Sequence, residues 1–140
     1  MAFPKFIALT ALALAFGVSA LAQTTPAADQ PTLTIVSPTE GQSVSATVNV
    51  EFRVANIKIE RPMPGHVDQP GAMRTGHIHV RVDDTPWIWL HDVDEPVGVA
   101  GLSPGPHKVR LELAGSNHRP VDSKTVTFTV AAPDAGKMGK

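Results

Sequence analysis

The sequence contains no cysteine, and this absence excludes several kinds of chemistry. Without a thiol, the chain cannot use a cysteine nucleophile, form a disulfide or carry a lipid anchor on a cysteine. A domain of this length can bury a hydrophobic core without disulfides, so folding does not require them. Serine chemistry has no support either, because there is no Gly-x-Ser-x-Gly motif and Ser103 precedes a proline in a predicted turn. The sequence predicts no enzyme.

The sequence also lacks an excess of positive charge. Lysine and arginine total 12 against 13 acidic residues, which gives a formal net charge of −1. No basic patch is present to neutralise phosphates, and no basic amphipathic helix is present to lie on a membrane surface. We therefore predict no nucleic-acid partner and no stable membrane insertion.

Long apolar runs are absent apart from the N-terminus, which reads "MAFPKFIALTALALAFGVSALAQ". Its apolar run from Phe6 to Val18 is shorter than the roughly 20 residues that span a bilayer. Lys5 precedes the run, and Ala20-Leu21-Ala22 is a small-x-small cleavage pattern. We expect a signal peptide over residues 1–22 and a periplasmic or secreted protein.

Two further segments are predicted to lie outside the folded domain. Residues 23–31 are small, polar and interrupted by proline, and residues 131–140 show no apolar period. Such segments bury too little apolar area to offset the entropy lost on ordering. We expect a flexible linker over 23–31, one domain over 32–130 and a disordered tail over 131–140.

Within the domain the hydrophobic period is two rather than 3.6, which indicates half-buried strands. Proline and glycine separate the alternating segments, and no long helical period appears. About seven strands at this spacing predict an all-β, immunoglobulin-like sandwich. The alternating segments are "TLTIVSP", "VNVEFRVAN", "HIHVRVDD", "PWIWLH", "VGVAGL", "HKVRLEL" and "KTVTFTV".

The stretch "GLSPGPHKVRLEL" resembles the corner that enters strand F of immunoglobulin-like domains. His107 stands where many such domains place tyrosine, and we expect its ring to hydrogen-bond nearby backbone. The ordered set "GHIHVRVDDTPW", "GLSPGPHKVRLELA" and "DSKTVTFTV" resembles a family of short exported bacterial proteins of unknown function. That resemblance implies an exported β-sandwich and no catalytic residue.

The histidines are the candidate metal ligands. In immunoglobulin strand order, one end of the sandwich collects His77 and His79, His118 from the last hairpin and His66 from the long loop 57–75. Met63 and Met73 belong to the same loop and, with Trp87, Trp89 and His91, are candidates for a ligand-binding surface. Imidazole suits zinc and copper, and a thioether suits copper. Two alternatives stay open: a copper or zinc site, or two polar residues on the wet face of a strand.

The hairpin after the His-x-His pair can adopt two registers. A three-residue loop, Asp84-Thr85-Pro86, pairs His79 with His91 and puts Trp87, Trp89 and His91 on the outer face as a binding surface. A two-residue loop turns those three side chains inward and leaves His77 and His79 outside. The burial of two indoles favours the second register.

The sequence is consistent with two alternative functions. The first is a small exported, non-enzymatic module that binds copper or zinc. The second is a metal-free structural or protein-interaction module that uses the loop 57–75, since loops of that length are usually functional or disordered. A cupin-like metal enzyme is disfavoured, because "SPGPH" does not match the second cupin motif and is explained by the corner.

Overall fold

The structure is a computed structural model that describes residues 30–133. The predicted signal peptide (1–22), most of the linker (23–31) and most of the tail (131–140) lie outside the described residues. Residues 131–133 are exposed and follow the last strand. Within the described range, no helix is long and apolar enough to cross a membrane.

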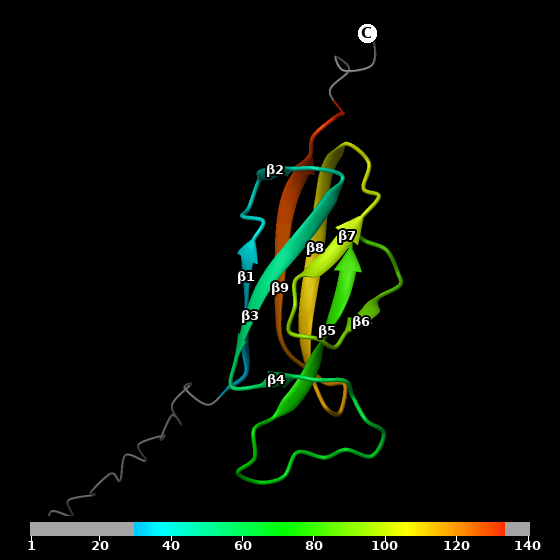
Figure 1. The fold of residues 1–140 in the computed structure, drawn as a ribbon. Coiled ribbons are helices and arrows are strands. Elements are labelled where there is room, and N and C mark those ends of the chain that lie inside the picture. Colours follow the sequence, from blue (N-terminus) through cyan, green and yellow to red (C-terminus); the bar gives the residue numbers. More distant parts are fainter. Residues whose placement is uncertain (1–29, 134–140) are drawn as a thin grey trace, which may run out of the picture.

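The described residues fold into strands that form two sheets (Figure 1). The strands are β1 (Thr32–Ser37), β2 (Gln42–Val44), β3 (Thr47–Ala55), β4 (Lys58–Ile59), β5 (Thr75–Val82), β6 (Trp89–His91), β7 (Val97–Ala100), β8 (Gly105–Gly115) and β9 (Pro120–Val130). The smaller sheet has the order β1-β3-β7, and the larger has the order β2-β9-β8-β5-β4, with β6 paired to β5. β5, β6, β8 and β9 thus share one sheet, and β3 lies in the other.

The core lies between the two sheets, and the predicted alternation explains it. Val50 of β3, Ile78 of β5 and Leu111 of β8 are fully buried from opposite sides. Burial of such a side chain contributes about 1.5–3 kcal/mol. The all-β sandwich prediction is confirmed. The buried core cluster comprises Leu33, Val48, Val50, Ile57, Ile59, Ile78, Val80, Val82, Val97, Val99, Val109, Leu111, Leu113, Val126, Phe128 and Val130.

Two short strands were not expected from the sequence. β2 pairs in parallel with the end of β9, and β4 pairs in parallel with the start of β5. Neither strand has enough residues to show a hydrophobic period. Each forms only because it pairs with a longer neighbouring strand. β4 lies within residues 57–75, which were predicted to form one long loop.

The β5–β6 hairpin has the second of the two predicted registers. His91 pairs with Ile78 and Trp89 pairs with Val80. Because cross-strand partners face the same way, His91 and Trp89 lie on the same inward face as Ile78 and Val80. The prediction that Trp87 also turns inward is wrong, because β6 begins only at Trp89. Trp87 lies in the connecting segment 83–88 and is 57% exposed.

Candidate metal centre

His77 and His79 both point to the outer face of β5, because the core face of this strand is filled by Ile78 and Val80. The expectation that this outer face is wet is wrong for His77. Its side chain is 0% exposed, whereas that of His79 keeps 15% of its surface. The histidine pair therefore lies on a face that the rest of the chain covers at one end.

The cover over His77 comes from the segment that follows β4. Residues 60–63 and His66 line a small cavity together with His77, and Arg61 donates from Nε to Asp92 Oδ2 at 2.7 Å. This ion pair joins the segment after β4 to the segment after β6. The ring of His118 adds a further contact, with its centroid 4.6 Å from that of His77.

His118 reaches the group from the turn between β8 and β9. The backbone N–H of Gly115 donates to Arg119 O at 3.0 Å, and the N–H of His118 donates to Gly115 O at 2.9 Å. His118 has a φ of 59°, a left-handed conformation that histidine tolerates better than most residues. A three-residue hairpin loop commonly ends in this conformation. The turn lies at the same end of the sandwich as the segment after β4 (Figure 1).

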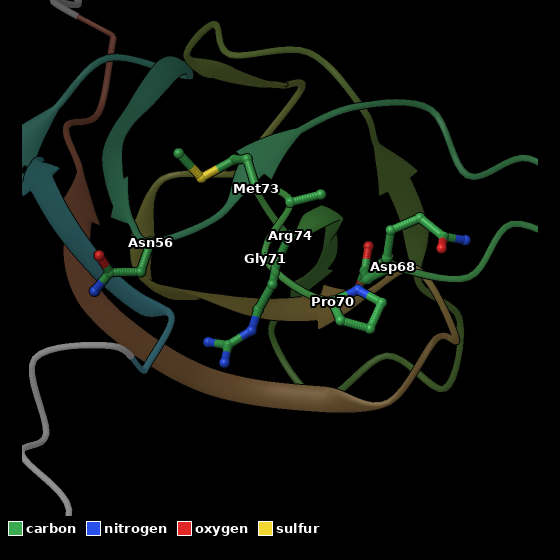
Figure 2. Close-up of a pocket in the computed structure, with 8 residues that line it drawn as sticks. Asn56, Asp68, Pro70, Gly71, Met73 and Arg74 are labelled. Carbon is green, nitrogen blue, oxygen red and sulfur yellow. The ribbon is translucent and has the colours of Figure 1, made fainter.

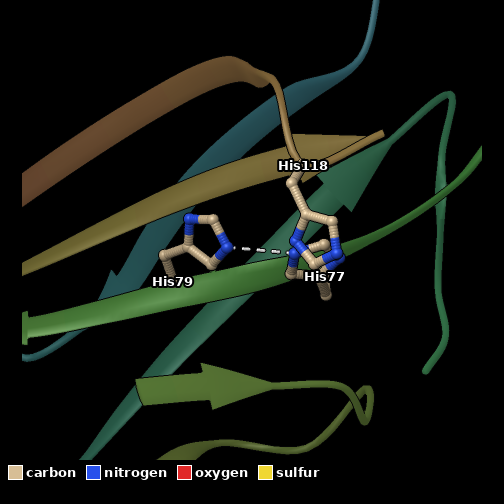
Figure 3. A group of neighbouring side chains, drawn as sticks. All are labelled: His77, His79 and His118. Carbon is tan, nitrogen blue, oxygen red and sulfur yellow. Dashed lines mark hydrogen bonds between the residues drawn. The ribbon is translucent and has the colours of Figure 1, made fainter. Parts of the chain in front are cut away.

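The three rings are turned toward one another (Figure 3). One ligand nitrogen from each of His77, His79 and His118 lies within 4.8 Å of the others, and the Nε2 atoms of His77 and His79 are 3.0 Å apart. Nitrogens around a tetrahedral zinc ion with bonds near 2.1 Å are about 3.4 Å apart. The three side chains are therefore close enough to hold a metal ion after small ring rotations.

A carboxylate orients one of these ligands. Nδ1 of His79 lies 3.3 Å from Glu112 Oε1, and Glu112 stands directly opposite His79 across the β5–β8 pair. Because the carboxylate accepts the proton on Nδ1, the lone pair of His79 is on Nε2 and faces His77. Metal-binding histidines usually have such a partner on the second nitrogen. Arg110 in turn contacts Glu112 at 3.2 Å.

The environment of His77 keeps its ring neutral. Burial, followed by the neighbouring rings of His79 and His118, lowers the pKa of His77 to about 4, against a smaller opposing effect of Asp92. A neutral imidazole is the form that binds metals. Among the described residues, Nδ1 of His77 is the buried side-chain nitrogen or oxygen that has no hydrogen-bond partner. Leaving such an atom unpaired costs about 1–3 kcal/mol, so its presence calls for a compensating interaction.

The loop residues predicted to join the site are not part of this three-histidine group. His66 lines the cavity beside His77, but its Nε2 lies 3.6 Å from Asp68 Oδ1. Met63 borders the same cavity and is 61% exposed, whereas Met73 lines a separate groove. The structure brings together His77, His79 and His118, and leaves His66, Met63 and Met73 around or beyond them.

The three residues predicted to share a binding surface, Trp87, Trp89 and His91, have different environments. Nε2 of His91 donates to Glu95 O at 2.8 Å, and its ring packs edge-on against Phe52 at 5.8 Å. Trp89 packs against the core, and only Trp87 is largely exposed. His91 therefore belongs to the packing between the sheets rather than to the histidine group.

His107 lies at the opposite end of the sandwich and hydrogen-bonds backbone as predicted. Its Nε2 donates to Ser103 O at 2.8 Å, and its Nδ1 donates to Asp83 Oδ2 at 2.9 Å. The Asp83 contact first, and the Ser103 carbonyl second, raise the pKa of His107. Ser103, His107 and Asp83 thus adjoin, but Nε2 faces the Ser103 carbonyl and offers no lone pair to the hydroxyl. The His107 ring therefore links the corner before β8 to the segment that follows β5.

Sequence reasoning missed Glu112 and the Arg61–Asp92 pair. Glu112 becomes visible only through the β5–β8 register, which sets it against His79. Arg61 and Asp92 are separated by 31 residues and meet only through the fold. No local motif marks either of them.

Comparisons with known proteins place the chain in a family. None of the curated proteins matches it. The structure of an endo-beta-1,4-mannanase from Thermotoga petrophila aligns with 74% of this chain at 17% identity and a TM-score of 0.48, and this chain spans 20% of that protein. A family model matches residues 4–140. The chain belongs to a family of unknown function (DUF6130).

Proposed function

We propose that the protein is a small exported, non-enzymatic module that binds one copper or zinc ion through His77, His79 and His118. The observation that carries this proposal is the convergence of three imidazole nitrogens within 4.8 Å of one another, one of them on a fully buried ring. A buried nitrogen without a hydrogen-bond partner, such as Nδ1 of His77, is costly unless its ring contributes to a site.

The donor set fits both metals. Neutral imidazole binds zinc and copper, and the chain has no thiolate to favour other ions. Met63, which borders the cavity beside His77, adds a thioether that favours copper in its reduced state. Comparing Zn(II), Cu(II) and Cu(I) therefore separates a zinc site from a copper site.

Calorimetric titration tests the proposal. We expect one ion per chain to bind to the wild-type protein, and binding to be lost in a His77→Ala/His79→Ala variant. His79→Ala and His118→Ala alter less buried rings and serve as milder versions if the double variant does not fold. His66→Ala is the control, because its imidazole lies outside the group and its removal should leave the affinity unchanged. Saturable binding that survives in the double variant contradicts the proposal.

Export rests on the N-terminal pattern of Lys5, the apolar run and the Ala20-Leu21-Ala22 motif. Mass spectrometry of the protein recovered from the bacterial periplasm or medium tests it. We expect a mature chain that begins at Gln23. An intact N-terminus on protein recovered from the cytoplasm contradicts export.

A second candidate is a metal-free interaction module. Residues 68–74 and Asn56 line a groove of about 610 Å³ (Figure 2), and Met63, Val67 and Met73 are each more than half exposed. Exposed apolar side chains on a loop favour contact with a partner. If no metal binds, comparing wild-type protein with a Met73→Asp variant in crosslinking from intact cells tests this candidate, which expects a partner that the variant loses.

A further inference from the structure

The three histidines differ steeply in exposure. His77 is fully buried, His79 is 15% exposed, and His118 is exposed at the tip of a hairpin. His77 and His79 come from β5, which is paired with β8, β6 and β4. His118 comes from a turn whose backbone hydrogen bonds lie within the hairpin, and Ser116 Oγ of this turn donates to Asp68 Oδ2 at 3.2 Å. Two ligands are thus anchored in the sheet, and the third stands at the surface.

The group has three nitrogen donors. No fourth histidine, aspartate or glutamate of the described residues belongs to it. Structural zinc sites are closed by four protein ligands, whereas sites with three protein ligands keep one position open to an outside ligand. Because His77 is fully buried and His118 is the most exposed of the three rings, an outside ligand can reach the group beside His118.

We propose that this site passes its metal ion to an acceptor by ligand exchange at the His118 side. This inference rests on the proposed function. A nitrogen or sulfur donor of the acceptor supplies an electron pair to the open position and forms a new metal–ligand bond. The bond to His118 then breaks, and its electron pair returns to the imidazole ring. The bonds to His79 and His77 break last, as further acceptor donors replace them, and the metal keeps its oxidation state throughout.

The contacts of the two inner rings favour this order. Glu112 holds His79 through Nδ1, and Arg110 holds Glu112, so His79 is fixed from the side away from the group. His77 is enclosed and packs against both other rings, with centroids at 4.8 Å and 4.6 Å. His118 has no carboxylate partner among the described residues, and its ring can leave the group by moving toward solvent.

Stopped-flow transfer of Zn(II) to a chromophoric chelator tests the proposal. Protein loaded with one equivalent of Zn(II) is mixed with increasing excesses of 4-(2-pyridylazo)resorcinol, which supplies nitrogen and oxygen donors. We expect the observed rate to rise in proportion to chelator concentration, because the chelator enters before the protein ligands leave. A rate that is independent of chelator concentration reports spontaneous release from a closed site and overturns the proposal.

The His118→Ala variant provides the second arm, with Arg119→Gln as a matched control in the same turn. We expect His118→Ala to transfer zinc about tenfold faster or more, since affinity losses show mainly in dissociation rates. Arg119→Gln should keep the wild-type rate. If His118→Ala retains zinc and transfers it at the wild-type rate, the proposal is wrong although metal binding stands. If calorimetry detects no zinc or copper binding at all, both the proposed function and this inference fail.

Discussion

The Nε2 atoms of His77 and His79 lie 3.0 Å apart on the outer face of β5, with both rings neighbouring His118. At that separation one nitrogen donates to the other, so the two rings share a proton where a metal ion would otherwise sit. The lowered pKa of His77, about 4, keeps its ring neutral in this arrangement. His77 and His79 are therefore not two independent surface histidines but interact directly with one another.

Glu112 is expected to strengthen metal binding through His79. Replacing it with Gln removes the negative charge that holds the Nδ1 proton, and we predict a Kd for Zn(II) about 10–100 times higher. The free energy of unfolding should change by less than about 1 kcal/mol, because the Arg110–Glu112 pair is partly exposed. Calorimetry and chemical denaturation measure the two effects.

Glu51→Gln is the matched control for that variant. Glu51 is an exposed carboxylate on β3, in the other sheet, so it should leave the Kd unchanged. An equal loss of affinity in both variants would show a general charge effect and no specific role for Glu112.

Gly76 is expected to be required for the close approach of β5 to β8 beside His77. A Cβ at this position would overlap the backbone oxygen of Ala114 and come within 2.6 Å of Ile57 Cδ1. We predict that Gly76→Ala lowers the free energy of unfolding by about 2 kcal/mol. It should also weaken metal binding, because the strand that carries His77 must shift.

Gly98→Ala in β7 is the corresponding control. The nearest atom to its added Cβ is Asn49 Oδ1 at 3.7 Å, an ordinary contact, so the added methyl group fits. Thermal denaturation compares the stabilities of the Gly76→Ala and Gly98→Ala variants. A Gly76→Ala variant as stable as Gly98→Ala would contradict the tight packing of β5 on β8.

The His107–Asp83 contact is expected to stabilise the fold over a limited pH range. His107 has a raised pKa, so its contribution is full below about pH 6.5 and is lost as the pH rises through its folded value. Burial raises the pKa of Asp83, but the Lys108 N–H and the His107 ring outweigh it and lower the pKa overall. Its contribution is therefore full above about pH 3.9 and is lost on acidification.

Because the pKa of His107 is raised and that of Asp83 is lowered, we expect His107→Gln to reduce the free energy of unfolding most between about pH 4 and pH 6.5. We expect a loss on the order of 1 kcal/mol there, allowing for solvent screening at half-exposed Asp83. Asp84→Asn is the control, because the Asp84–Lys108 pair is exposed and should contribute little at any pH. Urea denaturation across this range measures both. A loss that does not vary with pH would contradict the titration of this contact.

The sandwich was predictable because alternation reports directly which face of a strand is buried. Val109, Leu111 and Leu113 alternate with charged residues, and the structure buries all three. The hairpin before β6 was less predictable, because its connecting segment is longer than either loop considered and leaves Trp87 outside the strand. β2 and β4 exist only through pairing with longer neighbours, which no local pattern encodes.

The histidine group was predictable in part. Strand order alone brings His118 to the end that holds His77 and His79. The burial of His77 was not predictable, since it depends on where the loop residues 60–63 and His66 lie beside the outer face. The same loop was expected to supply His66 as a ligand, but in the structure His66 lies beside Asp68 instead.

X-ray absorption at the zinc edge shows whether the three histidines bind the ion. The protein is loaded with one equivalent of Zn(II), and the multiple-scattering pattern of imidazole counts the histidine ligands. We expect three imidazole nitrogens at about 2.0 Å and one further light-atom ligand. A first shell with one imidazole or none, or one that is unchanged in the His77→Ala/His79→Ala variant, would contradict a metal site at His77, His79 and His118.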